Sequence, residues 1–96
     1  MIEDMKVGQL VDRINIRLRV DEPDLSPKSI LKASNVNGYK AQGFIKPAPE
    51  KAAEKAYFEY THIHEELIYR AFRKILQGIR TPVAFEKAMD ELHSLF

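Results

Sequence analysis

His62, His64, Glu65 and Glu66 form the densest group of side chains that could bind a metal ion or transfer a proton. On a helix His62 and Glu66 would share a face, because residues four apart project to the same side, whereas on a strand the two histidines would. A catalytic zinc needs three converging protein ligands, and the third histidine, His93, has no spacing relation to this group. The pattern is more typical of a solvent-exposed helical turn with His–Glu pairs, and we predict no metal site.

The residue patterns that support nucleophilic catalysis or bind nucleotide phosphates are missing. The chain has no cysteine, which removes thiolate nucleophiles and thiolate metal sites. No Gly-x-Ser-x-Gly motif is present, and the four glycines at positions 8, 38, 43 and 78 never cluster as they do in a phosphate-binding loop. We therefore expect a non-enzymatic protein with no catalytic residues and no cofactor.

A run of 24 residues, 26–49, contains four lysines and no Asp or Glu. We call it the acid-free segment. Ammonium groups, side-chain amides and helix N-termini contact phosphates, and an exposed aromatic ring can stack on an unpaired base. The segment predicts a nucleic-acid contact surface, although a solvated lysine-bearing loop has the same composition. The candidate contact residues are Lys28, Lys32, Asn35, Asn37, Tyr39, Lys40, Gln42 and Lys46.

Composition restricts the protein class. The 96 residues are 45% hydrophobic and carry a net charge of +1, which favours one folded domain over a disordered chain. The longest apolar runs are three residues, far short of the roughly 20 needed to cross a bilayer, so we expect no membrane segment. The acidic start Met1-Ile2-Glu3-Asp4 lacks the pattern of a secretory signal, and this start and the absence of cysteine predict a cytoplasmic protein.

The first half of the chain mixes several local patterns. A short helix is expected within Ile2–Leu10, and the alternation of apolar and polar residues over Arg13–Val20 predicts a strand with one buried face. Ser26-Pro27 is typical of a helix start and predicts a short helix over Pro27–Ala33. Asn37-Gly38 indicates either a β-hairpin or a simple loop.

Tyr39–Lys46 is expected to be extended, because Gly43 weakens a helix and Pro47 ends it. From Glu50 to Gly78 apolar residues recur every three or four positions, which predicts one long amphipathic helix with Gly78 at its C-terminal end.

Thr81-Pro82 starts a last helix, which would form an antiparallel helical hairpin with the long one. The expected fold class is therefore α+β, a single domain 1–96 with a mixed α/β part at 1–49 and the helical hairpin at 50–96.

A helix that long would measure about 40 Å, more than a compact domain of this size covers. Part of its apolar face would project from the domain, and such a face commonly packs against a second copy. We therefore predict a homodimer. Its interface would comprise Tyr60, Ile63, Leu67, Ala71 and Ile75.

Tyr57–Thr61 also fits a strand whose last residue, Thr61, caps a shorter helix starting at His62. In this version Gly43-Phe44-Ile45-Lys46-Pro47, the strand and the Thr61-to-Gly78 spacing resemble the wing and following helix of the MerR-type transcription regulators. The resemblance covers residues 43–96 and implies a winged-helix DNA-binding protein. Glu65 departs from it, since the family has an aliphatic residue there, and no helix-turn-helix is recognisable before the wing.

The leading interpretation is a small dimeric nucleic-acid-binding or regulatory module that contacts phosphates through the acid-free segment. A second is an adaptor or inhibitor that binds another protein through the helical hairpin or the same lysines. A third is the MerR-like winged-helix regulator.

Overall fold

The computed structural model describes residues 5–46 and 60–95. Within these ranges the chain forms four helices: α1 (Val7–Asp21), α2 (Ala33–Ala41), α3 (His62–Leu76) and α4 (Thr81–Leu95). The described residues contain no strand, only an isolated antiparallel bridge between Met5 and Tyr60. The expected α+β class is therefore wrong, because the described part of the chain is all-helical.

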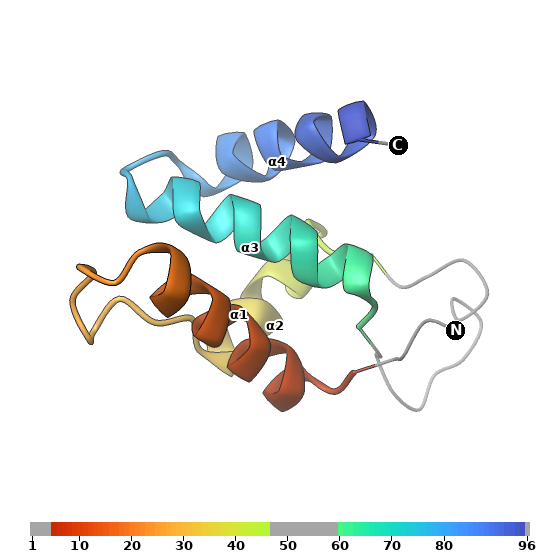
Figure 1. Cartoon of the computed structure of the whole chain (residues 1–96). Coiled ribbons are helices and arrows are strands. Elements are labelled where there is room, and N and C mark those ends of the chain that lie inside the picture. Colours follow the sequence, from red (N-terminus) through yellow and green to blue (C-terminus); the bar gives the residue numbers. More distant parts are fainter. Residues whose placement is uncertain (1–4, 47–59, 96) are drawn as a thin grey trace.

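Helix α3 occupies the centre of the molecule (Figure 1). It packs against α4 on one side and α1 on the other, and α1 also packs against α2. The core is built mainly from the facing sides of these helices: Leu10, Ile14 and Leu18 of α1, Val36 and Tyr39 of α2, Leu67, Ile68, Ala71 and Phe72 of α3, and Ala84, Phe85, Ala88 and Leu92 of α4.

The predicted strand Arg13–Val20 lies inside α1. Ile14 and Leu18 are buried, but Ile16 and Val20 are 65% and 75% exposed. A strand would bury all four on one face, whereas a helix buries residues four apart, and Leu10 extends the same buried row by one more turn. The apolar alternation arises because Ile16 and Val20 add two β-branched residues on the solvent side of the helix. The buried residues themselves recur every four positions.

The predicted short helix over Pro27–Ala33 and the predicted hairpin at Asn37-Gly38 are also wrong. Ser26 does organise a turn, because its hydroxyl and carbonyl oxygens accept hydrogen bonds from the backbone N–H groups of Lys28 and Ser29. The helix itself begins only at Ala33 and contains Asn37 and Gly38. Neither has the positive φ that a type I′ turn requires.

The segment Tyr39–Lys46 is not an extended strand, because α2 continues to Ala41 and a turn follows. Gly43 has a φ of 86°, a conformation that favours glycine. Its N–H donates to the Lys40 carbonyl and the N–H of Phe44 donates to the Tyr39 carbonyl, which is the Schellman pattern of helix ends.

The single long helix from Glu50 is wrong as well. Thr61 is extended, with φ −101° and ψ 175°, and its side chain accepts a hydrogen bond from the His64 N–H at the start of α3. The shorter helix from His62 with a Thr61 cap is therefore confirmed. Residues 50–59 of the predicted helix and residues 57–59 of the alternative strand lie outside the described residues.

The helical hairpin is confirmed, with α3 and α4 antiparallel and side by side (Figure 1). Gly78 ends α3 as predicted, with a φ of 96°. Its N–H donates to the Ile75 carbonyl and the Ile79 N–H donates to the Lys74 carbonyl, so the same Schellman pattern recurs. Thr81 begins α4 as expected.

Two isoleucines of α1 give a test of the helical assignment. Ile14→Ala should lower the free energy of unfolding by about 2–4 kcal/mol, because it leaves a cavity in the core. Ile16→Ala should change it by less than about 0.5 kcal/mol, because the residue is solvent-exposed. Urea denaturation of both variants measures the difference, and equal losses would contradict the assignment.

Candidate nucleic-acid interface

Helix α2 presents a solvent-facing side built from small residues. Val36 and Tyr39 are buried, whereas Ala33, Ser34, Asn37 and Ala41 are exposed. Asn37 lies near the middle of this side and carries its largest polar group. Short side chains allow a ligand to approach the helix backbone closely, and an amide offers both a donor and an acceptor.

Three of the candidate lysines flank α2 and are exposed: Lys28 and Lys32 before the helix and Lys46 after it. Within residues 5–46 and 60–95, no carboxylate forms an ion pair with any of the three ammonium groups. Lys40 is half-buried. The flanking lysines therefore keep their charge available to an external anion.

Of the remaining predicted contact residues, one is exposed and two are already used within the fold. Gln42 is exposed at the C-terminal end of α2. The Asn35 side chain is already used, because its Oδ1 accepts a hydrogen bond from the Lys32 N–H at 3.0 Å and so caps the helix. Tyr39 is a core residue, with its ring edge against Phe85 at a centroid distance of 5.0 Å. Burial raises the pKa of Tyr39, and its ring is not exposed for base stacking.

Side chains from two other helices hold the chain on either side of α2. Asn15 of α1 hydrogen-bonds to both backbone groups of Leu31, at 2.9 and 3.0 Å. His64 of α3 contacts the Lys46 carbonyl oxygen through Nε2 at 2.6 Å. Local sequence patterns indicate neither contact, since each joins residues 16 or more positions apart.

The hydrogen bonds of His64 define its neutral tautomer. The Thr61 N–H donates to Nδ1 at 3.0 Å, so Nε2 carries the proton and donates to the Lys46 carbonyl. The ring is buried, with Tyr60 against it in an edge-on arrangement. Burial lowers the pKa of His64, because the imidazolium would lose its hydration there, and the hydrogen bond to Lys46 opposes this only in part.

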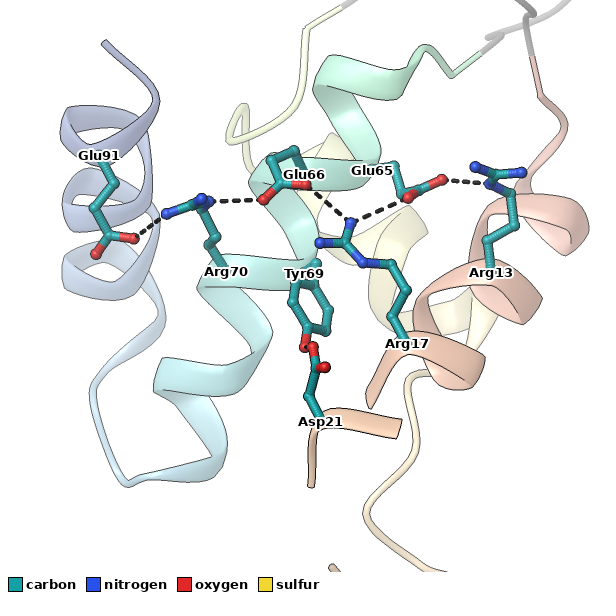
Figure 2. A network of polar contacts seen from close by, with 8 residues as sticks. All are labelled: Arg13, Arg17, Asp21, Glu65, Glu66, Tyr69, Arg70 and Glu91. Atoms are coloured by element: carbon teal, nitrogen blue, oxygen red, sulfur yellow. Dashed lines mark hydrogen bonds and ion pairs between the residues drawn. The ribbon is translucent and has the colours of Figure 1, made fainter. Parts of the chain in front are cut away.

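A network of charged side chains joins α1, α3 and α4 (Figure 2). Glu65, which is buried, accepts hydrogen bonds from Arg13 and Arg17 of α1. Glu66 accepts from Arg17 and from Arg70, both at 2.9 Å. These arginine partners lower the pKa of Glu66, although burial acts in the opposite direction. The carboxylate at position 65, where the MerR-type pattern has an aliphatic residue, is therefore accommodated by two arginines.

The network continues on both sides of α3. Glu91 of α4 accepts from Arg70 at 3.0 Å and from Lys74 at 2.6 Å, and both cations lower its pKa. The Tyr69 hydroxyl donates to Asp21, and the Arg17 guanidinium lies 4.1 Å from the centre of the Tyr69 ring. Several of these side chains line an open polar groove of about 550 Å³. Most cations in the groove already have carboxylate partners, so we assign it a structural role.

The histidine cluster is divided by α3. His62 and Ile63 point to solvent, whereas His64 and Glu65 are buried in separate hydrogen-bonded contacts. The described part of the chain contains no group of three or more ligand side chains that could hold a metal ion.

The predicted dimer-interface residues are mostly internal. Tyr60, Leu67 and Ala71 belong to the core of the single chain, Ile75 is partly buried, and Ile63 is 55% exposed. Because α3 has 15 residues, it is about 22 Å long, which a domain of this size can cover. The homodimer stays a prediction without the support of a projecting helix.

No protein-family model, curated protein or solved structure was found to match this chain. No helix among the described residues has the length and apolar character needed to cross a bilayer.

The buried His64 predicts a pH dependence of stability. Its pKa is lower in the folded chain than the ordinary 6.5, so below that pH the unfolded chain binds more protons. The free energy of unfolding should therefore fall as the pH decreases from about 6.5 towards 5. Urea denaturation at several pH values would measure the slope. His64→Ala should be less stable at pH 7.5 and should lose this slope, and an unchanged slope in that variant would contradict the assignment.

The ion pairs of Glu65 predict that replacing its carboxylate by a neutral amide lowers the stability of the fold. Glu65→Gln removes the negative charge between Arg13 and Arg17 and should lower the free energy of unfolding by about 1–3 kcal/mol. Glu86→Gln is the control, because Glu86 is exposed on α4 and has no ion pair among the described residues, and it should change stability by less than about 0.5 kcal/mol. Equal effects of the two substitutions in thermal denaturation would contradict the role of Glu65.

Proposed function

We propose that this chain is a non-enzymatic nucleic-acid-binding module whose contact surface is the exposed side of α2 with the lysines that flank it. The observation that carries the proposal is that Lys28, Lys32 and Lys46, which precede and follow α2 in the chain, are exposed and without carboxylate partners among the described residues. The helix between them has an exposed side of small residues. Four of the arginines, by contrast, form ion pairs within the fold.

Duplex DNA fits this surface in shape. An α-helix enters the major groove, and an Asn amide can pair with the edge of an adenine. With α2 in the groove, Asn37 would face the bases. Lys28 and Lys32 would meet phosphates near the start of the helix, where backbone N–H groups also favour anions. Lys46 would meet phosphates near its other end.

The winged-helix interpretation is a more specific form of this proposal. The Thr61 cap and the start of α3 at His62 agree with the MerR-like spacing, and α1 and α2 precede the region of the proposed wing. The connection between α1 and α2, residues 22–32, is longer than the three or four residues of a standard helix-turn-helix. Most of the proposed wing lies outside the described residues.

A protein-binding role would use the same surface, because exposed lysines also attract an acidic partner. The exposed side of α2 between these lysines favours nucleic acid. Its short, uncharged side chains would let the helix approach the bases of a DNA groove, and it has no large apolar side chain of the kind that dominates protein interfaces. A cytoplasmic location, as the sequence predicts, would bring the chain into contact with nucleic acids. Binding measurements separate the two roles.

The salt dependence of binding tests the proposal. The affinity for a short DNA duplex should fall between about 50 and 200 mM salt with a log–log slope of about −0.9 per phosphate contact. In the variant Lys28→Gln, Lys32→Gln, Lys46→Gln this slope should weaken by about 2–3 units. Fluorescence anisotropy measures both, and the same titration with single-stranded DNA and RNA identifies the preferred ligand.

Lys87→Gln is the matched control, because Lys87 is an exposed lysine of α4 without an ion pair among the described residues. It should leave the slope unchanged. Asn37→Ala should lower the affinity and leave the slope unchanged, because an amide releases no counterions. No binding by the parent at about 50 mM salt, or equal slopes for the triple variant and Lys87→Gln, would overturn the proposal in favour of the protein-binding role.

A further inference from the structure

Asn15 makes an unusual contact for a helix residue, because one side chain satisfies both backbone groups of a distant residue. Its Oδ1 accepts from the Leu31 N–H at 2.9 Å, and its Nδ2 donates to the Leu31 carbonyl oxygen at 3.0 Å. This pairing imitates the exchange of hydrogen bonds between two strands. The Leu31 side chain is buried, so the residue is fixed by both its backbone and its side chain.

The contact supplies the polar link between this part of the chain and the helices. Within residues 26–31 the other hydrogen bonds are local, from the N–H groups of Lys28 and Ser29 to Ser26. In the described part of the chain no other hydrogen bond joins residues 26–31 to a helix. The contact to Leu31 is therefore the polar contact that places the segment 26–31 against the helices.

We infer that Asn15 is a positioning residue for nucleic-acid binding. By fixing Leu31 it sets the place of Lys28, three positions earlier, relative to the exposed side of α2, whereas Lys32 is joined to α2 by the Asn35 cap. A lysine whose backbone is already held in place loses less conformational freedom on binding, and this smaller loss raises the affinity. This inference rests on the proposed function and adds a residue that need not touch the nucleic acid.

At position 15 the side-chain amide supplies both the acceptor for the Leu31 N–H and the donor for the Leu31 carbonyl. A carboxylate would place an oxygen against the Leu31 carbonyl and would also add a negative charge near the lysines. Leucine has a similar size and no charge but offers neither a donor nor an acceptor. Asn15→Leu therefore removes the contact without changing the electrostatics of the binding surface.

The experiment compares Asn15→Leu with Leu92→Val, a core variant of α4 that lies away from the proposed contact surface. Both are titrated with the same fluorescent DNA duplex at several salt concentrations, at a temperature where circular dichroism shows both to be folded. Asn15→Leu should bind about tenfold more weakly at moderate salt. Its log–log salt slope should be weaker by about one unit, because Lys28 no longer meets a phosphate in register. Leu92→Val should keep the affinity and slope of the parent.

Each outcome decides between two claims. If the parent binds with the expected slope and folded Asn15→Leu binds with the same affinity and slope, the positioning role is wrong while the proposed function stands. If the parent does not bind at all, the proposed function itself fails, and the positioning role fails with it. Should Asn15→Leu not fold, Asn15→Ser replaces it, because the shorter polar side chain removes the paired contact without placing an apolar group there.

Discussion

The contact between Glu65 and the two arginines of α1 determines how the rest of the chain can be arranged. A carboxylate buried in the interior is tolerated only when cations and hydrogen bonds compensate it. Arg13 and Arg17 are one helical turn apart on α1 and both reach Glu65. The pairing therefore fixes the rotation of α1 about its axis as well as its distance from α3.

That rotation has consequences for α2. On a helix of 3.6 residues per turn, Arg17 and Asn15 lie on opposite flanks of the buried row formed by Ile14 and Leu18. One flank of α1 is bound to α3 by charge, and the other is bound to Leu31 by the Asn15 amide. The helix thus transmits the geometry of the α3–α4 hairpin to the segment that leads into α2. The proposed contact surface depends on a carboxylate on the other side of α1.

The hairpin could be predicted from sequence because its determinants are local. Apolar spacing in α3 and α4, Gly78 at a helix end and Thr81-Pro82 at a helix start all act within a few residues. The first half could not, because non-local contacts override its local patterns. The alternation around Ile16 was misleading without knowledge that Arg13 and Arg17 have a partner in α3. The turn at Ser26 does not continue as a helix because Asn15 binds Leu31.

For the candidate site, composition identified the lysines, whose exposure follows from the cost of burying an unpaired ammonium group. It could not place Tyr39, since an aromatic residue on a short helix fits a ligand-stacking role and a core role equally well. Only its contact with Phe85, 46 positions later in the sequence, assigns it to the core. The capping use of Asn35 was equally hidden, because it depends on the helix starting at Ala33 instead of Pro27.

The two kinds of cation serve different purposes in this chain. A guanidinium is planar and offers several donors in fixed directions, so one arginine can connect two carboxylates, as Arg17 connects Glu65 and Glu66. An ammonium group on a flexible stem holds no such geometry but stays hydrated and can adjust to a phosphate that varies in position. Arg13, Arg17 and Arg70 are in ion pairs between helices, and Arg73 pairs with Glu22 just after α1. The lysines that flank α2 extend into solvent. A net charge of only +1 is therefore compatible with a phosphate-binding surface, since the acid-free segment that holds the flanking lysines contains no carboxylate to offset their charge.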